Sequence, residues 1–270
     1  MKPVFEITPK AIFFQQTNLF CEISRDGFSC IFMNDTDKKF HGLFVFYFNN
    51  DATVASQLKE VFTEQPLLRK AYKKVFVSWS GEESALLPEE LYKTEESENL
   101  LNTLYGDNGE YVAATDLVAD KKIYNTYRIP ATVQQVIVEQ FPLAAITHQY
   151  SLLVRQDVEG DLLKVIFYKD TFVLQLVKDG ALQIIRTCPY QSGDDVVYHL
   201  LNTCRQFNCE EVPLQAGGMI DKDSDLHKKL LHYFEHFTFD ALPASFAYTR
   251  QLSALPPYYF SHLFSLALCV

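Results

Sequence analysis

One order of strands and helices occurs twice in this chain of 270 residues, and no other feature restricts the possible folds as strongly. In each half, three segments rich in β-branched and aromatic residues come before a segment with apolar residues at helical spacing, and a short apolar segment follows. The predicted strands are residues 18–24, 28–33, 42–48 and 74–79 in the first half, and 162–168, 172–177, 182–186 and 212–216 in the second.

The spacing of these segments agrees between the halves. Leu19 and Leu162, near the starts of the first strands, are 143 positions apart, and so are Asp51 and Asp194, which come before the helices. The fourth strands are offset by 137 positions. Few side chains are identical, so the repeat depends on order and spacing. The alternative is that the same order arises twice by chance, and we favour a duplication.

The repeated order predicts an α/β protein. Three antiparallel strands followed by a helix, a parallel strand and a helix make a mixed sheet with helices on its faces. Two such β-β-β-α-β-α units form two lobes around a cleft. We expect the first lobe at residues 1–130, with an acidic insertion at 82–110 that forms a helix and an exposed loop. We expect the second at residues 131–270, with a C-terminal helix at 256–268.

Charge and composition exclude several classes of function. The chain has 24 Lys and Arg against 34 Asp and Glu, a net charge of -10, which disfavours nucleic-acid binding because phosphate contacts need clustered cations. No run of about 20 apolar residues could cross a membrane. The N-terminal residues lack the pattern of a secretory signal, and the six cysteines form no C-x-x-C pair. We expect a cytoplasmic protein with reduced thiols.

The duplicated unit resembles the ribonuclease H-like units of the actin-like ATPase superfamily. In the second half, residues 162–195 are similar to bacterial pilus-assembly and cell-division members in the order and length of the hairpin, third strand and helix. The whole chain resembles a family of uncharacterised bacterial proteins of this size that has an actin-like fold and is known as a domain of unknown function. The resemblance implies the fold, a bacterial source and a C-terminal helix at 256–268 that packs back on the first lobe, and that family offers no activity to carry over.

The resemblance also implies where ATP phosphates and Mg²⁺ would bind. The superfamily holds them with an Asp-x-Gly-Thr hairpin after the first strand of each half. Here Asp26 and Gly27 are adjacent and Phe28 replaces the hydroxyl residue, so a two-residue turn with positive φ explains the pair better. The second hairpin has Asp170 and Thr171 but no glycine, which hinders close approach of a phosphate to the backbone. Both hairpins therefore depart from the motif.

The superfamily's adenosine motif is a strand that ends in Gly-Gly before a helix. Gly217 and Gly218 match it in place and in residue type. The other interpretation is a strand-to-helix turn that needs a positive φ, and we favour it because the phosphate hairpins depart from their motif. The candidate nucleotide residues are thus Gly217, Gly218, Asp26, Gly27, Asp170 and Thr171.

One short motif suggests a different chemistry. His232, Glu235 and His236 spell the H-x-x-E-H pattern of inverted zinc peptidases, and on a helix the two histidines would lie one turn apart. A third ligand is not evident in the sequence. We predict no metal site and no catalytic residues, and we interpret the motif as an exposed helix face.

These observations predict a non-catalytic or weakly nucleotide-binding scaffold, a pseudo-ATPase that acts through a protein partner and needs no cofactor. The alternative is an active ATP-binding actin-like ATPase or kinase-type enzyme that uses the cleft between the lobes, with Asp26 or Asp170 binding Mg²⁺. A sensor of a small ligand is a third possibility. Side chains such as Phe28, Tyr168 and Phe172 filling the space beside Gly217 and Gly218 would favour the scaffold.

Overall fold

The computed structural model describes residues 1–107 and 109–269. The chain divides into two compact units, each described by itself below. The first contains Met1–Arg155 and Ser245–Leu252, and the second contains Gln156–Ala244 and Ser253–Leu268.

The first unit is built on a mixed sheet in the order β1-β4-β3-β2-β5-β9, with β15 also paired to β4. Strands β2, β3 and β4 are antiparallel, and β5 and β9 continue the sheet in the direction of β2. The strands are β1 (Phe5–Ile7), β2 (Thr17–Ser24), β3 (Gly27–Asn34), β4 (Lys39–Tyr47), β5 (Lys74–Ser80), β9 (Ala145–His148) and β15 (Ala247–Tyr248). The four strands predicted for the first half are all present.

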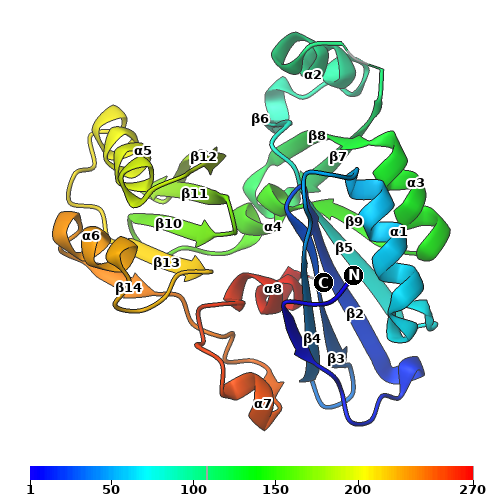
Figure 1. The fold of residues 1–270 in the computed structure, drawn as a ribbon. Helices are drawn as coiled ribbons and strands as arrows, with labels where there is room; N and C mark the ends of the chain where they lie inside the picture. The colour runs from blue at the N-terminus through cyan, green and yellow to red at the C-terminus, as the bar shows by residue number, and fades with distance from the viewer. Residues whose placement is uncertain (108, 270) are drawn as a thin grey trace. The chain divides into compact units, whose positions relative to one another are not determined.

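Helices α1 (Val54–Glu64) and α3 (Ala131–Gln140) lie along one face of this sheet, and α4 (Gln149–Arg155) follows β9 (Figure 1). The side chain of Thr53 accepts a hydrogen bond from the backbone nitrogen of Ser56 at 3.2 Å. Thr53 is therefore the N-cap of α1, two residues after the predicted Asp51. Apolar residues of both helices pack with the sheet in one buried cluster.

A smaller antiparallel sheet, β6-β8-β7, is inserted between β5 and α3. It consists of β6 (Ser84–Pro88), β7 (Tyr111–Val118) and β8 (Ile123–Pro130), with α2 (Ser97–Tyr105) between β6 and β7. The helix expected within residues 82–110 is present, but part of the expected loop forms β6. Strand β6 pairs with β8, from Ser84 opposite Tyr127 to Pro88 opposite Ile123, and this distance along the chain explains why local sequence patterns did not indicate the strand.

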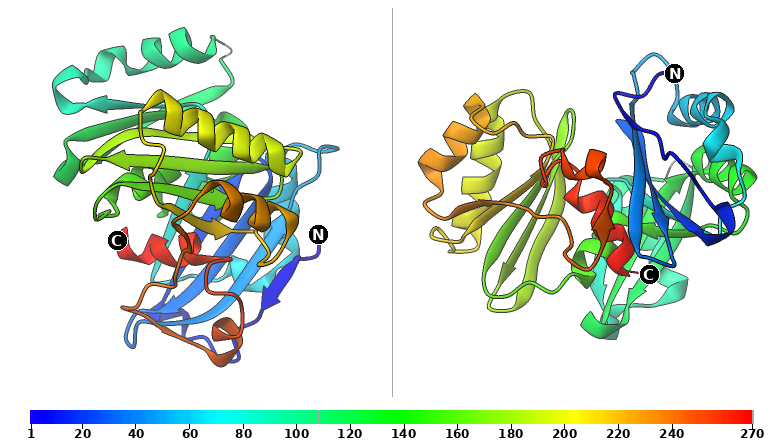
Figure 2. Two further views of the ribbon diagram at one scale, coloured as in Figure 1. Left: turned by 90° about the vertical axis from the view of Figure 1, so that its left-hand side faces the viewer. Right: turned by 90° about the horizontal axis from the view of Figure 1, so that it is seen from below.

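The second unit has a five-stranded sheet in the order β12-β11-β10-β13-β14. Helices α5 (Gly193–Gln206) and α6 (Asp225–Tyr233) pack on it, and α8 (Ser261–Ser265) contacts β13. Figure 2 shows these helices from two further sides. The strands are β10 (Leu162–Phe167), β11 (Thr171–Lys178), β12 (Ala181–Pro189), β13 (Leu214–Gly218) and β14 (Phe237–Phe239). A short helix, α7 (Arg250–Ser253), lies after β15.

The two sheets confirm the duplication. The order β4-β3-β2-β5-β9 in the first unit corresponds strand by strand to β12-β11-β10-β13-β14 in the second. In both, the first three strands are antiparallel, and the fourth and fifth run parallel to the first. This is the ribonuclease H-like arrangement expected from the sequence.

The first unit extends beyond residue 130, the lobe boundary expected from the sequence. Val133, Val136 and Ile137 of α3 are buried in the same cluster as Leu58 of α1, so α3 belongs to the first core. At the other end of the chain, the residues expected to form one helix at 256–268 form α8 and a 3₁₀ turn at Leu266–Cys269, and residues 253–268 group with the second unit. In the described part of the chain, no helix has the length and apolar character needed to cross a membrane.

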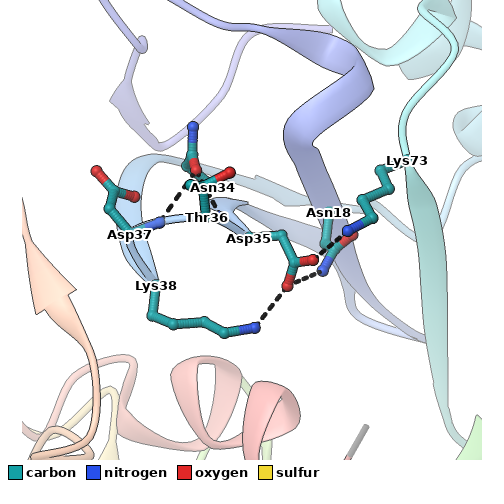
Figure 3. A network of polar contacts seen from close by, with 7 residues as sticks. All are labelled: Asn18, Asn34, Asp35, Thr36, Asp37, Lys38 and Lys73. Carbon is teal, nitrogen blue, oxygen red and sulfur yellow. Dashed lines mark hydrogen bonds and ion pairs between the residues drawn. The ribbon is translucent and has the colours of Figure 1, made fainter.

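A polar network holds the turn between β3 and β4 to the chain before β5 (Figure 3). The carboxylate of Asp35 pairs with Lys38 at 2.6 Å and with Lys73, and it accepts a hydrogen bond from Asn18 at 3.3 Å. In the same turn, the Asn34 side-chain oxygen accepts hydrogen bonds from the backbone of Thr36 and Asp37. The hydrogen bonds from Lys38 and Lys73 lower the pKa of Asp35 from 3.8 to about 2.

Asp35→Asn should lower the free energy of unfolding at pH 7 by about 1 kcal/mol, a value that allows for solvent screening of the two exposed lysines. Because the folded-state pKa is depressed, the carboxylate stabilises the fold above its unfolded-state pKa, and this contribution is lost as the pH falls from about 4 to about 2. Urea denaturation at several pH values measures this dependence.

The matched control is Asp37→Asn, because Asp37 lies in the same turn and its carboxylate has no ion pair among the described residues. It should change stability little at pH 7. Equal losses for the two variants, or a loss for Asp35→Asn that does not shrink with falling pH, would contradict the role given to Asp35.

Candidate functional site

Gly218 lies at the end of strand β13, next to the backbone of β10. The two strands are parallel, and Gly218 is paired with Phe167. Gly218 has a φ of 82°, and a Cβ atom there would overlap the carbonyl oxygen of Phe167 and lie 2.6 Å from its nitrogen. Both the backbone conformation and the close packing therefore require glycine. This agrees with the favoured interpretation that the Gly-Gly pair serves a turn with positive φ.

The space next to Gly217 is occupied by other residues of the same unit. A Cβ atom on Gly217 would lie 3.1 Å from the hydroxyl of Ser261 and 3.2 Å from the Cβ of Asp240. The backbone nitrogen of Gly218 donates a hydrogen bond to the carbonyl oxygen of Tyr258 at 2.7 Å. Both glycines are buried. The backbone that the resemblance assigns to adenosine is thus covered by the chain itself.

Asp240 is held in this position by two polar partners. Its carboxylate accepts a hydrogen bond from the Ser261 hydroxyl at 2.9 Å and lies 3.3 Å from the ammonium of Lys164. The Lys164 and Asp240 side chains are only 11% and 12% exposed, and Lys164 also donates to the side chain of Gln156 at 3.2 Å. Removing one partner of a buried ion pair leaves an uncompensated charge, which is strongly unfavourable.

His262 is buried beside this ion pair. Burial lowers the pKa of His262 from 6.5 to about 4, the charge of Lys164 acts in the same direction, and the charge of Asp240 opposes them. The imidazole is therefore neutral at pH 7. Its ring packs edge-on against Tyr168 with the ring centres 5.3 Å apart. Lys164, Asp240 and His262 are thus largely buried and in contact with partners of the same unit, as is typical of side chains that stabilise the interior of a fold.

The first candidate hairpin differs from the prediction. The predicted tight turn joins β2 and β3, but neither Asp26 nor Gly27 has a positive φ, so the predicted backbone conformation is wrong. Gly27 begins β3, and a Cβ atom there would overlap the carbonyl oxygen of Phe46 on β4. Close packing between strands is therefore the reason for glycine. The carbonyl oxygen of Asp26 accepts a hydrogen bond from the backbone nitrogen of Phe48, and the backbone nitrogen of Asp26 donates one to the hydroxyl of Ser24.

In the second candidate hairpin, backbone hydrogen bonds join the turn to its flanking strands. The nitrogen of Tyr168 donates to the carbonyl oxygen of Thr171 at 2.8 Å, and the nitrogen of Tyr190 donates to that of Asp170 at 3.1 Å. The exposed carboxylate of Asp170 lies 3.5 Å from the ammonium of Lys169. Because Phe167 pairs with both Phe172 and Gly218, this turn and Gly218 lie at the same end of β10.

The side chains next to the glycines are not the ones that the sequence indicated. Phe172 is buried in the core of the second unit, and the glycines contact the side chains of Asp240 and Ser261 and the carbonyl oxygen of Tyr258. Sequence reasoning missed these three residues because they are distant from the glycines along the chain. Lys164 gave a usable signal, since a cation inside a strand of otherwise apolar residues needs a buried partner.

The expected helical spacing of the H-x-x-E-H motif is wrong. Helix α6 ends at Tyr233, so Glu235 and His236 lie beyond it and His236 is not one helical turn from His232. Among the described side chains of residues 1–107 and 109–268, no group of His, Cys, Asp and Glu is arranged to hold a metal ion. Cys21 and Cys30 are directly paired on β2 and β3, both as free thiols, and burial raises the pKa of each.

The chain is similar to a family of proteins of unknown function and to several solved structures. A family model described as "Protein of unknown function (DUF3822)" matches residues 11–237. No curated protein sequence matches the chain significantly. A Bacteroides thetaiotaomicron protein with an actin-like ATPase fold and unknown function is 18% identical, with a TM-score of 0.81 over 96% of this chain and 100% of that one.

Two further solved structures are similar over most of their length. The type IV pilus biogenesis complex PilM–PilN matches with a TM-score of 0.62 and 12% identity, covering 93% of this chain and 98% of that one. The cytoplasmic domain of EpsL, an inner-membrane component of the Vibrio cholerae type II secretion system, matches with a TM-score of 0.50 and 10% identity, covering 94% and 95%. The chain has the actin-like ATPase fold, as the sequence predicted.

Gly218→Ala should destabilise the protein by at least about 3 kcal/mol, because the added methyl group overlaps the backbone of β10 and the φ is positive. Gly180→Ala is the matched control. Gly180 also has a positive φ, of 71°, but no atom lies within 4 Å of the Cβ position, so its cost should be about 1 kcal/mol. Urea denaturation compares the two, and equal costs would show that close approach to β10 does not matter.

Proposed function

The chain belongs to the DUF3822 family of proteins of unknown function, and within it we propose a non-catalytic, at most weakly nucleotide-binding scaffold that acts through contacts with another protein. In this proposal the actin-like architecture is kept as a rigid framework, while the machinery for ATP is replaced by internal packing. The protein is then a pseudo-ATPase of the bacterial cytoplasm.

The observation that carries this proposal is the covering of Gly217 and Gly218 by residues of the same unit. An adenosine lying on these glycines would have to displace Asp240 and Ser261. Moving Asp240 would also leave the buried ammonium of Lys164 without its carboxylate at 3.3 Å. Breaking a buried ion pair typically costs about 3 to 5 kcal/mol, which a weakly held nucleotide could not supply.

The hairpins support the same conclusion. Gly27 serves the packing of β3 on β4, and the Asp170 turn has no glycine to let a phosphate approach its backbone. Neither hairpin contains the hydroxyl and glycine at the spacing that the ATPase motif needs. The residues that would organise phosphate and Mg²⁺ are therefore replaced or used in structural contacts.

Two solved structures with a similar fold favour a protein partner. PilM occurs in a complex with PilN, and EpsL is a component of a secretion system. Both share the architecture of this chain, and both are parts of assemblies. A cytoplasmic location agrees with the five described cysteines, all of which are buried free thiols.

ATP with Mg²⁺ should not raise the unfolding temperature of the protein, and no phosphate should be released from ATP. A ligand at a hundredfold excess over its Kd would stabilise the fold by about 2.7 kcal/mol, which a thermal shift measurement detects readily. Gly217→Ala is the control, because its methyl group would lie against Ser261 at the candidate site. A clear rise in the wild type that disappears in Gly217→Ala would overturn the proposal in favour of an ATP-binding enzyme.

A further inference from the structure

A cavity of about 570 Å³ lies in the first unit, between the loop that follows β1 and the segment Thr249–Gln251. This volume falls within the range of roughly 300–1,000 Å³ that is usual for ligand pockets. None of the candidate nucleotide residues lines it. The cavity is therefore a separate feature with a structural origin of its own.

The cavity arises because two segments share one edge of β4. Strand β1 pairs with Leu43–Val45, and β15 pairs with Lys39 and Phe40. Between the two pairings, Gly42 has no side chain, and the carbonyl oxygen of Ile7 and the ring of Pro9 come within 2.6 Å of where a Cβ would be. The chain then continues through residues 10–13, which line the cavity, towards β2.

The far wall is held in place by aromatic packing. The ring of Phe40 contacts Phe246 edge-on at 5.2 Å and stacks on Tyr248 at 5.5 Å. The backbone nitrogen of Thr249 donates to the carbonyl oxygen of Phe40 at 3.1 Å. These contacts fix the position of Arg250, the next residue, at the cavity. The pocket is thus formed in advance of any ligand.

Positive charge gathers at this cavity although the whole chain has a net charge of -10. Lys10, Lys39 and Arg250 line it, and Asp37 is the one carboxylate among the lining residues. In the described part of the chain, none of the three cations has an ion pair. The neighbouring Lys38 and Lys73 are different, because both reach the carboxylate of Asp35 from its two sides (Figure 3).

The remaining wall is largely apolar. Ile12, Phe13 and Phe32 line the cavity, and Phe13 is 68% exposed at its edge. Thr249 is also a lining residue, and its buried hydroxyl has no hydrogen-bond partner among the described residues. An exposed aromatic ring beside unpaired cations is a combination typical of protein interfaces.

We infer that this cavity binds a short acidic peptide segment of a partner protein, with an apolar side chain in the cavity and carboxylates on Lys10, Lys39 and Arg250. The inference rests on the proposed function, since it names the kind of partner that the scaffold would bind. The three cations complement the charge of a few carboxylates, which a short peptide segment can carry. A long polyanion such as nucleic acid would also meet the excess negative charge of the rest of the chain, which repels it.

An array of short synthetic peptides tests the inference with the full-length protein. One set combines Asp and Glu with Phe and Leu, and a matched set replaces each acid with Asn or Gln. The acidic set should bind and the amide set should not. Fluorescence anisotropy of the best peptide should show an affinity that falls as salt rises from about 0.05 to about 0.5 M, because salt screens the exposed cations.

Variants locate the binding. Arg250→Glu should weaken the peptide about tenfold, and Phe13→Ala should weaken it about fivefold without unfolding the protein, since that ring is mostly exposed. Asp37→Asn should tighten binding about twofold by removing the opposing carboxylate. The matched control is Lys222→Glu, which makes the same change in net charge at an exposed residue outside the cavity lining and should leave the affinity unchanged.

Three results would overturn the inference. The first is equal binding of the acidic and amide sets, and the second is an equal effect of Arg250→Glu and Lys222→Glu. The third is binding of a small carboxylate such as hexanoate with no binding of any peptide. Stabilisation by ATP would instead overturn the proposed function and leave the peptide result as it stands, so the two failures are distinguishable.

Discussion

The close approach of β13 to β10 is the constraint on which the second unit depends. At Gly218 the two parallel strands leave no room for a Cβ atom, and the chain leaves β13 with a positive φ. The backbone nitrogen of Gly218 then donates a hydrogen bond to the carbonyl oxygen of Tyr258, and the backbone nitrogen of Asp240 donates one to the carbonyl oxygen of Ala216 in β13. Through these contacts the chain after β14 is packed against the end of β13. Gly218 belongs to the pair that the resemblance assigns to adenosine, and its backbone nitrogen is hydrogen-bonded to the protein's own backbone.

The two copies of the duplicated unit have diverged in different ways. The first gained an inserted sheet and helix between its fourth and fifth strands, and it accepts β15 from the C-terminal part of the chain on the edge of β4. The second kept a minimal five-stranded sheet but covers its Gly-Gly turn with Asp240, Ser261 and the segment around Tyr258. Both changes pair backbone edges and buried polar groups within one unit, as the interior of any folded protein requires.

Several charged side chains also have their partners within the same unit. Lys164 is neutralised by Asp240 inside the second unit, and Lys38 and Lys73 are neutralised by Asp35 at the β3–β4 turn. The cations at the cavity near Arg250 have no such carboxylate among the described residues. In an acidic protein, cations without an internal partner are the groups most available to an external one.

The sequence by itself determined the repeated order of strands and helices and therefore the fold, because apolar periodicity and turn residues are local signals. Residues 18–48 and 162–186 show this clearly: each hairpin-connected strand was evident from its own residues. The sequence also determined that the phosphate hairpins lack their motif. The tertiary structure alone decided that Gly27 packs on Phe46, that Asp240 and Ser261 cover Gly217, and that Arg250 and Lys10 line one cavity. These contacts join residues that are far apart along the chain, and only the folded backbone brings their atoms within a few ångströms of each other.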